Sequence, residues 1–262
     1  MIDLSRVFRA LWLAPAALAV TACEGTAPKP AQPISLSITT KGSSGAAVAA
    51  APGIQAAIQI GSGANSLTIN QAQVVLARIE LQSTGSCATT GEDDDCAELR
   101  LGPTLVDLPV DPTTQVMLED AAVPAGTYSG VQAKLDAVRA DDDEPGASSF
   151  LAAHPDFAGI SVKVVGVFTD GSNTTHDFTF TAEVDAELAA TFNPPVTLAS
   201  DTKNFTMAVD IASWFKDESG AVIDPTNPAN AEAIARNIAR SARVFEDDNH
   251  DGVDDHEEGD HN

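Results

Sequence analysis

Hydrophobic and polar residues alternate with a period of two along much of the chain, which is typical of β-strands that bury one face. In residues 75–82, for example, Val75, Ala77, Ile79 and Leu81 share one face. The same alternation predicts strands over residues 131–138, 177–184 and 205–211. Weaker patterns predict further strands over residues 34–40, 54–60, 66–70, 104–108 and 160–168.

Turn-forming sequences separate the predicted strands: Pro52-Gly53, Pro124-Ala125-Gly126, Pro145-Gly146, Asp170-Gly171-Ser172-Asn173 and Pro194-Pro195. Many short strands with one polar face favour a mainly β fold, an antiparallel β-sandwich of the immunoglobulin- or transthyretin-like kind. Long helices between the strands, which a doubly wound fold requires, are absent from the pattern. We therefore expect a β-sandwich domain over residues 34–226.

One helix is predicted after this domain, over residues 227–245. Asn227-Pro228 supplies an N-cap followed by proline in the first turn. Ile234, Ala235, Ile238 and Ala242 then follow a helical stripe. An acidic tail over residues 246–262 completes the chain.

The first 22 residues have the pattern of an export signal. Arg6 and Arg9 precede an apolar run over residues 10–20, which is shorter than the about 20 residues that span a bilayer. Val20-Thr21-Ala22-Cys23 then resembles the lipobox of bacterial lipoproteins. The resemblance implies that Cys23 becomes the lipidated (palmitate-bearing) N-terminus, and an ordinary secretory signal is the alternative.

A lipid on Cys23 would anchor the protein to a membrane of the cell envelope. Glu24 follows the cysteine where an aspartate is associated with retention in the inner membrane, so the outer membrane is favoured. Residues 23–33 contain Pro28, Pro30 and Pro33, and they predict an extended tether between membrane and domain.

Two further cysteines, Cys87 and Cys96, bracket a polar loop that contains Gly91. In an oxidising compartment they should form a disulfide, which would contribute about 2.5–3 kcal/mol in the chain-entropy model. A dithiol metal site is the alternative, although no second cysteine pair completes a zinc tetrahedron.

The charge balance narrows the choice of partners. The chain has 38 acidic and 14 basic side chains and a formal net charge of -24, and loss of residues 1–22 would change this to -25. Such a surface repels nucleic acid and attracts divalent cations. Hydrophobic residues make up 44% of the chain, so a sizeable core can form.

The acidic tail contains a pattern that matches the EF-hand calcium loop, D-x-[DN]-x-[DN]-G-x5-E. The expected calcium ligands are Asp247 at position 1, Asn249 at 3, Asp251 at 5, the Val253 carbonyl at 7, Asp255 at 9 and Glu258 at 12. Calcium takes six to eight oxygen ligands, which alternate residues of a tight loop can supply, and Gly252 at position 6 would turn the chain.

The tail departs from a paired EF-hand because position 8 is Asp254 and a second loop of the pattern is absent. It therefore resembles the lone Asp/Asn-Gly loops of secreted bacterial proteins, for which binding at about 10⁻⁴–10⁻³ M is expected. A solvated acidic tail is one alternative. A transition-metal site at His250, His256 and His261 is another.

Val123-Pro124-Ala125-Gly126-Thr127-Tyr128, with Leu105-Val106-Asp107-Leu108 before it, resembles a turn of uncharacterised β-sandwich lipoprotein domains. The resemblance covers residues 34–212 and implies a fold without an assigned activity.

Motifs of metalloproteases, serine hydrolases, phosphate-binding loops and dinucleotide-binding folds are absent. We therefore expect a non-enzymatic structural or binding lipoprotein. A carbohydrate- or peptide-binding module is the alternative, for which Trp214 and Phe215 could form an exposed platform, although core packing is favoured for both residues. A hydrolase is a less favoured alternative.

Overall fold

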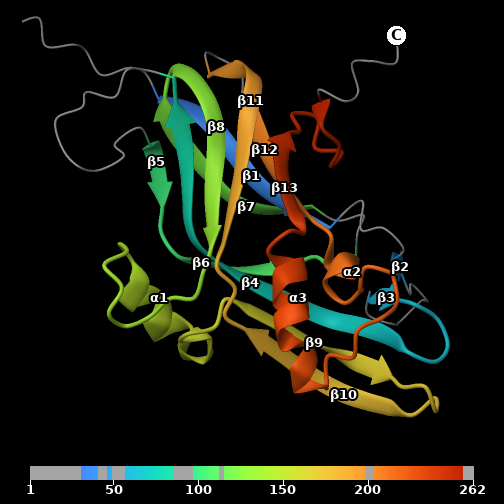
Figure 1. Ribbon diagram of the computed structural model, residues 1–262. Helices are drawn as coiled ribbons and strands as arrows, with labels where there is room; N and C mark the ends of the chain where they lie inside the picture. Colours follow the sequence, from blue (N-terminus) through green and yellow to red (C-terminus); the bar gives the residue numbers. More distant parts are fainter. Residues whose placement is uncertain are drawn as a thin grey trace, which may run out of the picture.

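The computed structural model describes residues 31–40, 46–48, 57–84, 97–111, 115–198 and 203–255. It is mainly β, with two packed sheets and a few short helices, which confirms the predicted β-sandwich (Figure 1).

The smaller sheet has four strands in the order β13-β12-β1-β7. These are β13 (Ala242–Glu246), β12 (Lys203–Val209), β1 (Ala31–Thr39) and β7 (Gln115–Pro124). β1 pairs antiparallel with β7 but parallel with β12, so the predicted antiparallel arrangement is wrong for this one pair. Parallel pairing is possible because β1 and β12 are joined by most of the chain rather than by a hairpin.

The larger sheet contains nine strands. They are β2 (Ala46–Val48), β3 (Ile58–Ile60), β4 (Ser66–Ser83), β5 (Ala97–Leu101), β6 (Thr104–Leu108), β8 (Gly126–Leu135), β9 (Val162–Thr169), β10 (Thr175–Ala182) and β11 (Ala186–Leu198). The 18-residue strand β4 is its spine. The first part of β4 pairs with β9 on one side and with β3 and β6 on the other, and its last part pairs with β8 and β5.

Aliphatic residues from both sheets meet in one core. The face of β1 that carries Ile34, Leu36 and Ile38 is buried against it, as are the aromatic side chains that follow β12. Trp214 and Phe215 are fully buried, and Phe215 makes edge-to-face contacts with two phenylalanine rings of β10. Core packing of these two residues, the prediction favoured over an exposed platform for a sugar, is therefore confirmed.

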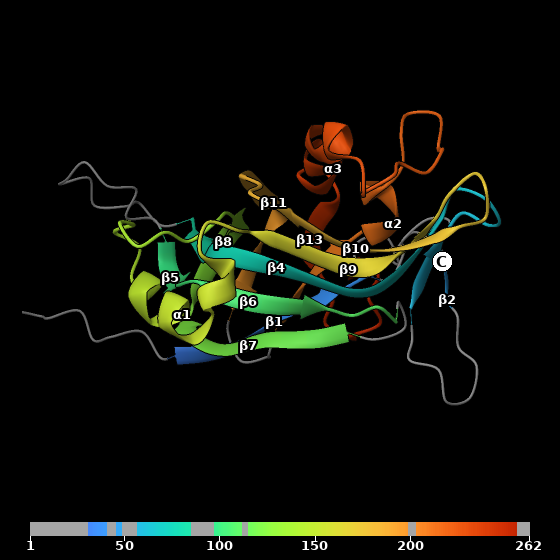
Figure 2. The same ribbon diagram turned by 90° about the horizontal axis from the view of Figure 1, so that it is seen from below.

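Three short helices accompany the sheets. α1 (Ala147–Ala153) lies on the opposite side of the molecule from α2 (Ile211–Trp214) and α3 (Ala231–Ile238) (Figure 1, Figure 2). Short 3-10 turns precede α3 at Pro228–Asn230 and follow α1 at Pro155–Phe157. None of the described helices is long and apolar enough to cross a membrane.

The predicted helix over residues 227–245 is wrong in its second half. α3 ends at Ile238, whose carbonyl accepts a hydrogen bond from the Ser241 hydroxyl at 2.8 Å. The chain then forms β13, in which Val244 pairs with Met207. Ala242 fits the helical stripe of Ile234 and Ile238 but also a period of two with Val244, and pairing with β12 decides between the two conformations.

The predicted strands differ from the observed ones mainly at their ends, whereas β2, β5, β7 and β11 were not predicted. The strand predicted over 104–108 matches β6, and those over 66–70 and 75–82 are parts of the single strand β4. The turn predicted at Pro194-Pro195 lies inside β11. The pairing of β11 with β8 shifts register between Thr191 and Val196, so the two prolines, which lack an N–H, sit in an irregular part of the ladder.

Candidate functional site

The outer face of the four-stranded sheet is polar but buried. Ser35 and Ser37 of β1 and Asn204 and Thr206 of β12 point away from the core, yet each is at most 3% exposed. Polar side chains in such positions normally face water. Here the chain beyond β13 folds back over this face, and Asp247 accepts hydrogen bonds from the side chains of Asn204 and Thr206.

Asp247, the first residue of the predicted calcium loop, is fully buried. Its Oδ2 accepts hydrogen bonds from the Thr206 hydroxyl at 2.9 Å, the Gly252 amide at 3.0 Å and Gln115 Nε2 at 3.2 Å. Its Oδ1 accepts one from the Asp251 amide at 2.9 Å. Four donors therefore satisfy a carboxylate that lies out of contact with water, as burial of a charge requires.

The backbone of Asp247 is held as firmly as its side chain. Its N–H donates to the Asn204 carbonyl at 2.9 Å, and its own carbonyl accepts from Asn204 Nδ2 at 2.8 Å. Asn204 Oδ1 in turn accepts from the hydroxyls of Ser35 and Ser37. The network therefore connects β1, β7 and β12, which are remote in sequence, to the start of the loop.

A lysine neutralises the two acidic residues that flank Asp247. Lys203 Nζ forms ion pairs with Glu246 and Asp248. Burial lowers the pKa of Lys203, but the hydrogen bonds that its ammonium donates to Asp248 and Glu246 outweigh burial and raise the pKa well above its usual range. Lys203 is therefore a permanent cation beside the loop.

Within the loop, side-chain oxygens hold backbone amides of the following residues. Asn249 Oδ1 accepts from the Asp251 amide at 2.9 Å, and Asp251 Oδ1 accepts from the Val253 amide at 2.8 Å. Asp255 Oδ2 accepts from the Asp248 amide at 2.7 Å, which closes the loop. Gly252 has a left-handed φ of 78°, so the tight turn predicted at position 6 is present.

The structure thus brings part of the predicted ligand set together. The side chains of Asp247 and Asn249 both accept a hydrogen bond from the Asp251 amide, and the side chain of Asp255 accepts one from the Asp248 amide at the start of the loop. No group of three or more His, Cys, Asp or Glu side chains takes a metal-binding arrangement within the described residues. Glu258 lies outside them, as do Cys23, Cys87, Cys96, His256 and His261.

Two features of the loop differ from an EF-hand. The expected incoming helix near Phe245 is replaced by β13, so a strand leads into the loop. The loop is also fixed to a sheet rather than to a second loop, through Thr206 and Gln115. Sequence reasoning missed both of these residues, because polar residues that alternate along a strand normally indicate a solvated face.

Comparisons with known proteins return one distant structural neighbour. MbnP from Methylosinus trichosporium has a TM-score of 0.35 and 11% sequence identity to this chain, over 82% of this chain and 98% of that chain. No family model matches the sequence. No curated protein matches it either.

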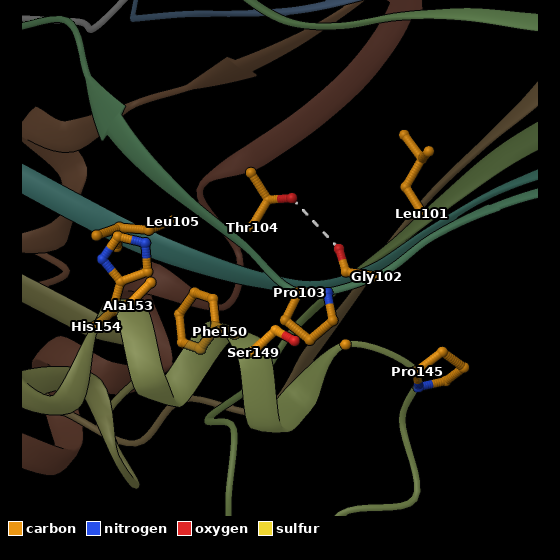
Figure 3. Close-up of a pocket in the computed structure, with 11 residues that line it drawn as sticks. Leu101, Gly102, Pro103, Thr104, Leu105, Pro145, Ser149, Phe150, Ala153 and His154 are labelled. Carbon is orange, nitrogen blue, oxygen red and sulfur yellow. Dashed lines mark hydrogen bonds between the residues drawn. The ribbon is translucent and has the colours of Figure 1, made fainter.

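A separate groove lies between the β5–β6 turn and α1, with a volume of about 590 Å³ (Figure 3). Leu101, Pro103, Leu105, Phe150 and His154 are among its lining residues. The ring of His154 packs against Phe150 at 5.0 Å between centroids, and no carboxylate is among the described residues that line the groove. The described lining of the groove therefore contains no pair of carboxylates for general acid–base catalysis.

Proposed function

We propose that this protein is a non-enzymatic lipoprotein of the cell envelope, anchored through Cys23, whose C-terminal loop binds one calcium ion. The proposed ligands are Asp247, Asn249, Asp251, the Val253 carbonyl, Asp255 and Glu258. Bound calcium would order the acidic tail against the sandwich. The observation that supports this most is the fixed position of Asp247, which accepts hydrogen bonds from the amides at loop positions 5 and 6.

The hydrogen bonds of Asp247 leave one oxygen suited to a metal. Among the described residues Oδ2 has three donors, whereas Oδ1 has only the Asp251 amide. An ionised carboxylate has about two acceptor sites on each oxygen, so Oδ1 keeps one. Asp247 could therefore bind calcium through Oδ1 without losing its attachment to the sheet through Oδ2.

The charge around the loop favours a divalent cation. Six of the ten residues from position 246 to 255 are acidic, and Lys203 neutralises only Glu246 and Asp248 among them. A hard cation with oxygen ligands would relieve the repulsion among the remaining carboxylates. The compartment outside the cytoplasm supplies calcium in the millimolar range that such a loop needs.

Thermal unfolding in calcium tests the site. We expect about 10 mM calcium to stabilise the wild-type protein by about 1.4–2.7 kcal/mol at the affinity of a lone extracellular loop. Asp251→Ala should abolish this gain, because it removes a ligand outside the buried network. Asp177→Ala, which removes an exposed carboxylate on β10, is the matched control and should keep the gain. An unchanged wild-type melting curve would rule out the site.

Mass spectrometry of protein from native membranes tests the anchor. The expected N-terminal peptide begins at Cys23 with fatty acid attached, and the peptides that contain Cys87 and Cys96 should be joined until a reductant is added. An intact Met1, or an unacylated Cys23, would contradict the proposed location.

A further inference from the structure

A second polar pocket, separate from the loop, lies where α3 ends and β13 begins. It has a volume of about 370 Å³ and is lined by Arg240, Arg243, Ser213 and Ser241, together with Asp210 and backbone of β12. Arg240 and Arg243 are both exposed to solvent. Two neighbouring arginine side chains are therefore accessible at one pocket.

The two arginines lack a carboxylate partner among the described residues. Elsewhere in the described part of the chain, six other basic side chains form ion pairs with carboxylates: Arg78, Arg100, Lys134, Arg139, Lys203 and Arg236. Arg240 forms none, and the guanidinium of Arg243 stacks over the Phe245 ring at 5.2 Å. In a chain with 38 acidic and 14 basic residues, two unpaired arginines at one pocket indicate space for an anion from outside.

The walls of the pocket are rigid. Trp214 Nε1 donates to the Ser241 hydroxyl at 2.6 Å, and the Asp210 amide donates to the Ser241 carbonyl at 3.0 Å. The Asp210 side chain caps α2 by accepting from the Ser213 amide at 3.2 Å. Arg243 is fixed along β13 by its register opposite Ala208. Because these hydrogen bonds already order the backbone of the pocket, binding has mainly the two exposed arginine side chains to order.

Local charge also permits an anion at this pocket despite the net charge of the protein. Residues 233–245 include Arg236, Arg240 and Arg243 and no acidic residue. Asp210 is a carboxylate that lines the pocket, and its side chain accepts a hydrogen bond from the Ser213 amide. At physiological salt the Debye length is about 8 Å, so the carboxylates beyond that range contribute little potential here. The guanidinium fork of arginine then matches the planar geometry of a carboxylate or the oxygens of a phosphate.

We propose that Arg240 and Arg243 form a binding site for an oxyanion, a carboxylate or phosphate group carried by a ligand. Arg243 pairs opposite Ala208, and Ala208 pairs opposite Thr39, at the far end of β1 from Ala31, where the tether enters. The site therefore lies at the end of β1 opposite to Ala31. Free or polymer-borne oxyanions fit this position better than headgroups of the anchoring membrane.

Nuclear magnetic resonance of the arginine Nε–H groups tests the site, with inorganic phosphate, acetate and phosphatidylglycerol vesicles as probes. Phosphate or acetate should shift the Arg240 and Arg243 signals in a saturable manner. Arg240→Gln with Arg243→Gln should weaken the binding by at least about tenfold, measured by titration calorimetry. Arg236→Gln, one turn earlier on α3, is the matched control and should bind as the wild type does.

Two results would overturn the site. One is the absence of saturable shifts with both phosphate and acetate. The other is an equal loss of affinity in Arg236→Gln, which would mean general attraction to positive charge. If vesicles bind although neither free anion does, the first of these results holds, and the proposed ligand class is wrong. Melting curves of each variant show whether the fold is intact.

Discussion

Replacement of Asp247 by alanine should destabilise the protein strongly, even without calcium. Four donors lose their acceptor: the amides of Asp251 and Gly252, the Thr206 hydroxyl and Gln115 Nε2. Hydrogen bonds to a charged group contribute about 1.5–3 kcal/mol each, so simple addition gives about 6–12 kcal/mol. The alanine variant also no longer buries a charge, which offsets part of this loss. We therefore expect about 3–5 kcal/mol, as when one partner of a buried charged network is removed.

The assay is thermal unfolding in a calcium chelator, with hydrogen exchange as a local readout. A loss of 3–5 kcal/mol corresponds to about 10 °C for a domain of this size. The amide protons of Asp251 and Gly252 should also exchange faster, because both lose their acceptor. Asp177→Ala, at an exposed position of β10, should change stability by less than about 0.5 kcal/mol.

The opposite result is that Asp247→Ala and Asp177→Ala unfold at the same temperature, with unchanged hydrogen exchange at the amides of Asp251 and Gly252. It would mean that Asp247 is solvated rather than buried, and the expected destabilisation would be refuted. If exchange rose while the melting temperature did not, the loop would be detaching alone, and the network would not contribute to the stability of the sheet.

Three further changes test other parts of the structure. Thr206→Val keeps the shape of the side chain but removes a hydroxyl with four hydrogen-bonding contacts. The free energy of unfolding, measured in urea, should fall by about 1–3 kcal/mol. The control Thr179→Val, at an exposed position, should leave it unchanged. Lys203→Met should lower the melting temperature at pH 7. The pKa of Lys203 is raised in the folded state, so its contribution to stability is fully present below the unfolded pKa of about 10.4 and is lost as pH rises further. The difference in melting temperature between Lys203→Met and the wild type should therefore narrow only in strong alkali. A constant difference there would contradict the ion pairs of Lys203 with Glu246 and Asp248. Gly166→Ala would place a Cβ against the carbonyl oxygen of Thr68 and should destabilise by about 1–3 kcal/mol. At Gly171 a Cβ would make only an ordinary contact with Asn65 Oδ1 at 3.9 Å, so Gly171→Ala should not destabilise. Equal melting temperatures of the two variants would mean that β9 and β4 do not approach so closely.

The fold class could be predicted from the sequence because one-sided strands leave a clear pattern. The strand at 104–108 and the cores of β1, β9, β10 and β12 follow from apolar residues at every second position. β11 was not predicted, because Pro194-Pro195 indicates a turn unless the irregular pairing with β8 is known. β13 was hidden for a similar reason, since Ala242 fits both periods and only contact with β12 selects one.

The loop could be predicted but its attachment could not. Asp247, Asn249, Asp251 and Gly252 follow a spacing that is local in sequence, and the turn at Gly252 forms as predicted. The partners of Asp247 come from β7 and β12, more than forty residues away along the chain in each case. Asn204 was one available signal, because asparagine is depleted in strands and a buried one needs partners.

Calcium binding to the purified mature protein is the most direct test of the central claim. Titration calorimetry after treatment with a chelator should give one calcium per chain with a dissociation constant of about 10⁻⁴–10⁻³ M. Asp251→Ala should lose this binding, and Asp177→Ala should retain it. If the wild-type protein takes up no calcium at about 10 mM, or if Asp251→Ala binds as well as the wild type, the loop is not a calcium site.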